Sequence, residues 1–265
     1  MKNRLRILVG ADVPPDPNSG AAGTVYHTNQ ALRELGYEVD EIWQDDLPHR
    51  ISHGNLHYLL ELPLGYRNAV RRRCREKDYD VIMLSQPHAW LAAMDHCRRN
   101  RRGVFINRSH GLEPRVDEAV RACRVQLDLH GKAFVKDCAS KLMKRCLNWT
   151  WHPVVKFSDG FVVPCEDDRD HLVSHLGASP RRVRIIHHGI PREYERAPVK
   201  PLTQERLQRI LHVGQHSFFK GQVYLPHILD EVMWSHPQTT FTWVCWKKNH
   251  NEALSMFDPK LHSRI

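Results

Sequence analysis

Several features that mark whole classes of protein are missing from this 265-residue sequence. No apolar run approaches the roughly 20 residues that a helix needs to cross a bilayer. The basic N-terminus is followed only by the short apolar stretch ILVGA, which is typical of a first β-strand and too short for a signal peptide. We therefore expect a cytoplasmic protein without a membrane-spanning segment.

Nucleotide- and metal-binding fingerprints are missing as well. The sequence contains neither GxGxxG nor GxxxxGK(S/T), so the dinucleotide and P-loop patterns are absent. Its seven cysteines form no CxxC pair. The histidine pair at 187–188 has no cysteine or carboxylate partner at ligand spacing. We expect free thiols and no metal site.

Positive charge, in contrast, is in excess, with 39 Lys and Arg against 30 Asp and Glu and a net charge of +9. This balance favours anionic partners such as nucleic acid, a phospholipid surface or phosphorylated substrates. The arginine-rich segments 67–77 and 98–102 lack interleaved aromatic residues and any known DNA-binding pattern. We expect no nucleic-acid partner, and two interpretations of these segments stay open: a solvated basic face, or contact with an anionic membrane surface.

Apolar segments alternate with helical patterns along the chain. Strands are predicted at 5–10, 37–43, 79–85, 103–109, 158–164 and 182–189, and again at 209–214 and 239–246. The alternation predicts βα units around a parallel sheet, so the fold class is α/β. Residues 117–150 predict a long helical region with an apolar stripe, which includes Leu142 and Trp149, and a basic opposite face.

The chain also shows a predicted domain boundary. Residues 190–206 contain three prolines and no apolar period, which is typical of a linker. We expect an N-terminal Rossmann-like domain over 1–195, a linker over 196–208 and an incomplete second Rossmann-like domain over 209–265.

Two loops of the first domain carry candidate ligand-binding residues. The loop PPDPNSGAAG offers Gly20 and Ala21, whose small size lets a ligand approach the backbone at a helix N-terminus that favours anions. An ordinary βα loop is the alternative. In NRSHGLEPR, His110 is placed to donate a hydrogen bond to a sugar hydroxyl or phosphate and Glu113 to accept one. A structural histidine is the alternative there.

A third candidate lies in the segment GQHSFFKG at 214–221. A strand, Gly214, a short loop with Gln215, and Lys220 at the expected start of the next helix would bring backbone N–H groups and one mobile cation together. This arrangement predicts a diphosphate-binding site, and a solvated lysine is the alternative.

Taken together, four segments resemble retaining GT-B glycosyltransferases of the family-4 type (glycosyl transferases group 1), which transfer sugars from nucleotide-sugars to cell-surface glycans. The segments are NSGAAGTVYHTNQALRELGYEVD, RSHGLE, SDGFVVPCEDDRDHLVSHLGASPRRVRIIHHGIPREY and ILHVGQHSFFKG. The resemblance covers nearly the whole chain but only the start of the family's second domain. It implies a GT-B-like fold, with a nucleotide-sugar as donor substrate and no metal or other cofactor.

The resemblance also implies roles for individual residues. Gly20 and Ala21 would lie near the sugar phosphate and acceptor, and His110 would face the donor sugar as the catalytic residue. Lys220, with Gly214 and Gln215, would bind the donor diphosphate and stabilise its departing charge. Gln215 stands where the family usually has arginine, and the family's E-x7-E segment has no counterpart here, which predicts low activity for this chain alone.

These implications define the expected function. We expect a glycosyltransferase of cell-envelope polysaccharide synthesis that acts on a glycan or lipid-linked acceptor, peripherally on the inner face of the membrane. Two alternatives remain open: a non-catalytic acceptor-binding or scaffold subunit of a split glycosyltransferase, and an inactive truncated product.

Overall fold

The computed structural model describes residues 4–52, 54–99, 102–126, 134–190 and 192–265. The chain divides into two compact units, Met1–Glu195 and Arg196–Ile265. Among the helices in these ranges, none is both long and apolar enough to cross a bilayer.

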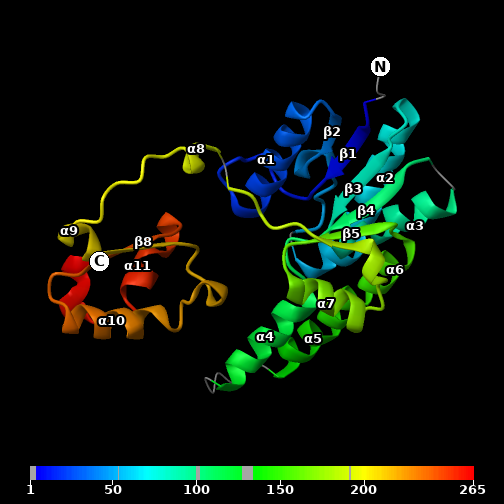
Figure 1. Cartoon of the computed structure of the whole chain (residues 1–265). Coiled ribbons are helices and arrows are strands. Elements are labelled where there is room, and N and C mark those ends of the chain that lie inside the picture. Colours follow the sequence, from blue (N-terminus) through cyan, green and yellow to red (C-terminus); the bar gives the residue numbers. More distant parts are fainter. Residues whose placement is uncertain (1–3, 53, 100–101, 127–133, 191) are drawn as a thin grey trace. The chain divides into compact units, whose positions relative to one another are not determined.

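Unit 1 is built on a six-stranded parallel sheet in the order β2-β1-β3-β4-β5-β6 (Figure 1). The strands are β1 (Arg6–Gly10), β2 (Glu38–Ile42), β3 (Val81–Ser85), β4 (Val104–Arg108), β5 (Gly160–Val163) and β6 (Val183–Ile185). Each lies within a predicted segment, and the α/β expectation is confirmed. The chain runs outward from β1 to β2 and then returns to the other side of β1 at β3. The strand order therefore reverses between β1 and β3, and such a reversal opens a crevice at the carboxyl ends of the strands.

Helices cover both faces of this sheet. Their bounds are α1 (Gly20–Glu34), α2 (Leu62–Glu76), α3 (Trp90–Arg98), α6 (Trp151–Phe157) and α7 (Glu166–Ser174). Strand β1 shows how the faces are divided, because its side chains alternate. Leu8 is buried in the cluster that contains residues of α2 and α3, whereas Ile7 and Val9 are buried with Val25 of α1. A further cluster around Trp151 joins α6 and α7 to β5 and β6.

The helical region predicted over 117–150 contains two helices, α4 (Glu113–Gln126) and α5 (Phe134–Trp149). They extend away from the sheet (Figure 1), and Lys144 of α5 forms an ion pair of 2.6 Å with Asp117 of α4. The apolar stripe is not buried along its length, because Leu142 and Trp149 are 65% and 62% exposed. The hydrophobic periodicity correctly predicted helices in this region, but it did not show which apolar side chains are buried against other residues.

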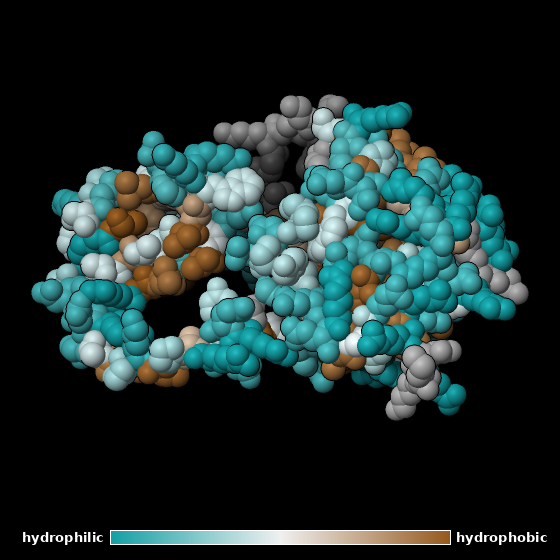
Figure 2. All heavy atoms as spheres, turned by 90° about the horizontal axis from the view of Figure 1, so that it is seen from above, coloured by the Kyte–Doolittle hydropathy of each residue, from teal (hydrophilic) through white to brown (hydrophobic). Residues whose placement is uncertain are grey.

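Unit 2 is smaller. Its strands β7 (Arg209–Val213) and β8 (Thr240–Val244) pair in parallel, and its main helices are α10 (Leu225–Ser235) and α11 (His250–Leu254). One face of the strands contributes Phe241 to a core with Leu229 and Met233. The opposite face exposes Leu211, Val213 and Val244. Figure 2 shows apolar residues on the surface of this unit, at the left of the view. Residues 196–203, at the start of this unit, form no helix or strand, and all of them are exposed.

Gly36 and Gly103 precede strands of the sheet and share a left-handed backbone conformation, so they test how tightly the turns before these strands are packed. Gly103, just before β4, has φ +87°, and a Cβ there would overlap the carbonyl oxygen of Tyr79 and lie 2.8 Å from that of Asp80. Gly36, just before β2, has φ +90° with open space around it. We expect Gly36→Ala to lower the free energy of unfolding by about 1–2 kcal/mol, the cost of the left-handed conformation alone.

Gly103→Ala carries that cost and the overlap with backbone atoms, so its loss of stability should be larger. Urea titrations of both variants measure the difference. Equal losses would show that the tight contact before β4 does not constrain the chain.

Candidate functional site

Polar residues of unit 1 gather where β1, β3 and β4 end. Asp12 lies two residues beyond β1, Gln86 directly follows β3, and His110 lies two residues beyond β4. Because parallel strands end at the same edge of the sheet, these three positions surround the crevice at the point where the strand order reverses. Sequence spacing identified His110, but Asp12 and Gln86 were missed.

Gln86 adopts a conformation that is costly for a residue with a side chain. Its φ is +65°, and among the described residues it is the one non-glycine residue with a positive φ. Its N–H donates to the carbonyl of Arg108 at 3.0 Å, and its own carbonyl accepts from the side chain of Asn107 at 2.8 Å. Its side-chain oxygen accepts from Ser109 at 3.3 Å. Neighbouring residues thus hold a strained turn, a feature that clusters at functional sites.

A cavity of about 390 Å³ lies at this edge. Its polar lining includes Asp12, Gln86, His88, His110 and Glu113. Ala21, Tyr58 and Tyr66 also line this cavity. Aromatic faces beside a few hydrogen-bonding groups are typical of a pocket for a polar organic ligand.

His110 is neutral in this cavity. Burial, with the nearby charge of Arg108, lowers its pKa to about 4. Its Nε2 lies 3.5 Å from Oγ of Ser85, and its ring stacks against that of His188 with 6.1 Å between centroids. A neutral imidazole can donate one hydrogen bond and accept another, so His110 is suited to contact hydroxyl groups rather than to supply a positive charge.

Glu113 begins α4 beside His110. Burial raises its pKa to about 7, and the charges of Asp117 and Asp168 add to the effect. Its Oε2 is buried and has no hydrogen-bond partner in the part of the chain that the structure describes. Near neutral pH this carboxyl group is therefore poised to exchange a proton.

A second cleft, of about 670 Å³, lies along α1 and includes Gly20 in its lining. Arg108, only 8% exposed, also lines it. The Nη2 of Arg108 donates to Oγ1 of Thr28 at 3.2 Å, whereas its buried Nη1 has no partner among the described residues. Burial lowers the pKa of this guanidinium. Gly20 and Ala21 thus lie on two different cavities, one on each.

Packing requires a glycine at Gly23, in the first turn of α1. The sequence analysis of the preceding loop did not single out this residue. A Cβ on Gly23 would lie only 2.6 Å from the carbonyl oxygen of Pro17. Gly20 has open space at the corresponding position. The close approach of residue 17 to α1 therefore depends on Gly23, and Gly20 leaves room at the helix N-terminus.

In unit 2 the segment at 214–221 differs from the expected geometry. Lys220 ends a short 3-10 turn (Phe218–Lys220), and α10 begins only at Leu225, so the lysine is not at a helix start. The N–H of Gly214 donates to Val244 and that of Lys220 to Ser217. These two N–H groups are therefore not directed at a ligand. Lys220 and Gln215 are exposed, and the stem of Lys220 passes close to Gly214.

Comparison with known proteins decides the family. Residues 18–194, more than half of the chain, match the model of Glycosyltransferase Family 4. The chain belongs to this family. No curated protein sequence matches it at a significant level.

Solved structures agree on the fold of this Family 4 chain. Sucrose-phosphate synthase from Thermosynechococcus elongatus is 15% identical with a TM-score of 0.59, covering 91% of this chain and 62% of that one. The catalytic domain of starch synthase IV from Arabidopsis thaliana, bound to ADP and acarbose, is 9% identical with a TM-score of 0.57, covering 91% and 68%. The chain thus spans about three fifths of the length of the first of these. The similarity confirms the expected GT-B-like fold.

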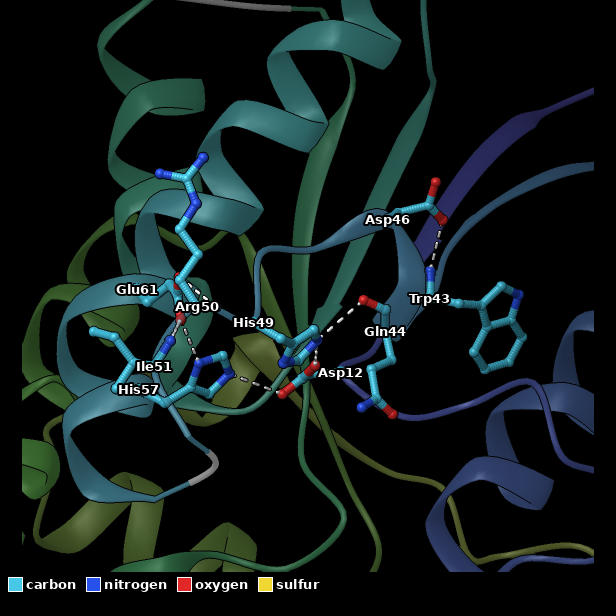
Figure 3. Close-up of polar contacts among 9 residues, drawn as sticks. All are labelled: Asp12, Trp43, Gln44, Asp46, His49, Arg50, Ile51, His57 and Glu61. Carbon is cyan, nitrogen blue, oxygen red and sulfur yellow. Dashed lines mark hydrogen bonds and ion pairs between the residues drawn. The ribbon is translucent and has the colours of Figure 1, made fainter.

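The Family 4 chain also contains a side-chain cluster that no sequence spacing indicated. Asp12, His49 and His57 come from separate segments and converge, with Glu61 behind His57 (Figure 3). The expectation of no metal site was drawn from neighbours in sequence, and these ligand types become neighbours only in the fold.

The raised pKa of Glu113 leads to a pH-dependent stability. Between its ordinary pKa of 4.5 and about 7, the unfolded chain ionises this carboxyl group and the folded chain does not. The protonated Glu113 therefore contributes its full share to the free energy of unfolding below pH 4.5. This contribution is lost as the pH rises to about 7. A shift of this size corresponds to about 3 kcal/mol.

Glu113→Gln removes this dependence. Unfolding free energies measured across this pH range should show the variant gaining stability relative to the wild type as the pH rises. Parallel curves for the two proteins would contradict the buried, neutral carboxyl group.

Proposed function

We propose that this Family 4 chain is a retaining glycosyltransferase that uses a nucleotide-sugar donor and a glycan or lipid-linked acceptor in cell-envelope polysaccharide synthesis. Family membership supports sugar transfer. The main support for a phosphate-bearing substrate is Arg108, whose buried guanidinium has no carboxylate partner among the described residues.

The electrostatics of the second cleft favour an anionic ligand. Burying an unpaired charge is costly, and an anion that binds Nη1 of Arg108 would offset that cost with a charge-assisted hydrogen bond. The N-terminus of the 15-residue helix α1, at Gly20, opens on the same cleft and adds a partial positive charge. A phosphate or diphosphate group meets both requirements.

The first cavity suits the sugar. His110 and Glu113 offer a neutral imidazole and a carboxyl group near its ionisation point, and Tyr58 and Tyr66 offer aromatic faces. We assign His110 as the catalytic residue that contacts the transferred sugar. The transfer itself is proposed to need no cofactor beyond the donor. In unit 2, Lys220 remains our candidate for the donor diphosphate, through its ammonium group alone.

Calorimetric titration with the diphosphates of uridine, guanosine and adenosine tests the proposal. We expect one of them to bind. Arg108→Gln should weaken that binding about ten- to a hundredfold, the loss of one charge-assisted hydrogen bond of about 1.5–3 kcal/mol. Arg121→Gln, on the exposed surface of α4, is the matched control and should leave affinity unchanged. Lys220→Ala tests the candidate in unit 2 in the same way.

The outcome separates the proposal from its alternative. If no nucleoside diphosphate binds the folded chain, an acceptor-binding or scaffold role is favoured. If one binds and Arg108→Gln has no effect, Arg108 is a structural residue and the phosphate assignment is wrong.

The exposed surface of α5 supports peripheral membrane contact. Lys141, Leu142, Arg145 and Trp149 are all exposed and recur at helical spacing. Basic side chains beside exposed leucine and tryptophan are typical of a helix that lies at a lipid interface. We propose that α5 contacts an anionic membrane surface.

Vesicle sedimentation tests this contact. Vesicles of phosphatidylcholine with added phosphatidylglycerol should bind the chain, and added salt should release it, because each basic residue contributes about 1 kcal/mol that ions screen. Trp149→Ser should weaken binding severalfold, and Leu35→Ser, an exposed leucine at the end of α1, should not. Equal binding to vesicles without phosphatidylglycerol would refute the proposal.

A further inference from the structure

We propose that Asp12, His49 and His57 bind one divalent transition-metal ion, with Zn²⁺ as the best fit, and that Glu61 positions His57 for it. The site would join three segments: the loop after β1, the loop that follows Gln44–Asp46, and the single π-helical turn His57–Glu61. Neither the family match nor the proposed function assigns a metal to these residues.

The distances are those of a ligand set. His49 Nε2 lies 3.3 Å from one carboxylate oxygen of Asp12, and His57 Nε2 lies 3.5 Å from the other. One ligand atom from each residue lies within 4.8 Å of the other two (Figure 3). Ligands bound to Zn²⁺ at about 2.0–2.2 Å in tetrahedral geometry are separated by about 3.3–3.5 Å. An ion therefore fits among the three with small side-chain movements.

Glu61 fixes the orientation of His57. Its carboxylate accepts the N–H groups of Arg50 and Ile51 at 3.0 and 2.9 Å, which hold it in place. Its Oε2 lies 3.0 Å from Nδ1 of His57. A proton on Nδ1 would be donated to this carboxylate, which leaves the lone pair of Nε2 directed at Asp12. Carboxylate–histidine pairs of this kind commonly support metal-binding imidazoles.

The arrangement needs a positive charge at its centre. With that tautomer, His57 Nε2 and the Asp12 carboxylate are both electron-pair donors that face each other. Both carboxylate oxygens of Asp12 are buried and accept no hydrogen bond from the described residues. A divalent cation would satisfy the three ligands, and the charges of Asp12 and Glu61 would balance it.

Access and ligand chemistry agree with this assignment. The side chain of His57 is fully buried, whereas that of His49 is 25% exposed and gives the ion an entry path. His49 Nε2 also lies 3.1 Å from the carbonyl oxygen of Gln44, so metal binding requires its proton to leave Nε2. Two imidazoles and one carboxylate suit Zn²⁺ and its neighbours in the first transition row rather than Mg²⁺ or Ca²⁺.

The expected role is structural. Asp12 also lines the first cavity, so an ion bound to it would hold the loop after β1 against the π-helical turn and fix one wall of that cavity. The ion has no part in sugar transfer on this proposal, and its test does not depend on the proposed function.

The test uses the whole chain, freed of metal with a chelator and then titrated with Zn²⁺ or Co²⁺. We expect one equivalent to bind tightly, visible absorption from bound Co²⁺, and a higher unfolding temperature with Zn²⁺. His49→Ala, at a partly exposed position, and the isosteric Asp12→Asn should each lose this equivalent. Glu61→Gln should weaken it about 10–100-fold.

Control variants separate this site from adventitious binding, since the chain has 19 histidines. His152→Ala, at an exposed position on α6, should keep the tight equivalent. Circular dichroism of each metal-free variant checks its fold. If the wild type binds no stoichiometric ion, or His49→Ala binds as the wild type does, the proposal is wrong. His57 would then be a buried structural residue between Asp12 and Glu61.

Discussion

The reversal of strand order between β1 and β3 is the constraint on which the rest of unit 1 depends. Because β1 lies inside the sheet, the chain leaves it toward α1 on one face and leaves β3 toward α3 on the other. The two loops diverge and open the crevice at the carboxyl ends of the strands. Both cavities, the strained turn at Gln86 and the converging side chains at Asp12 lie at or beside this edge.

The ion pairs of α3 show how a partly buried charge is satisfied elsewhere in unit 1. Asp95 of α3 accepts hydrogen bonds from Arg71 and Arg99, which lower its pKa to about 2. Arg108, by contrast, is more buried and has no such partner in the described chain. An unpaired buried charge is costly, so a bound anion at Arg108 would lower the free energy of the folded chain.

The two proposals for unit 1 meet at one residue without depending on each other. Asp12 contributes to the wall of the first cavity, and its carboxylate lies against His49 and His57. A metal ion at Asp12 would order the cavity from outside, while Arg108 and His110 would contact substrate groups. Ordering of a substrate wall by a remote structural contact is one way in which a fold positions its catalytic groups.

The sequence by itself determined the elements and the family resemblance. Alternating apolar segments located the eight strands of the described residues. His110 and Glu113 were identified because polar residues that follow a buried strand lie at the ligand-binding edge of the sheet. The tertiary structure decided everything that depends on neighbours distant in sequence. It exposed Leu142 and Trp149 and separated Lys220 from the start of α10. It left Nη1 of Arg108 without a hydrogen-bond partner among the described residues. It also brought Asp12 to histidines more than 35 positions away. Local periodicity encodes which residues can be buried, whereas pairing and pKa depend on atoms that only the folded chain brings together.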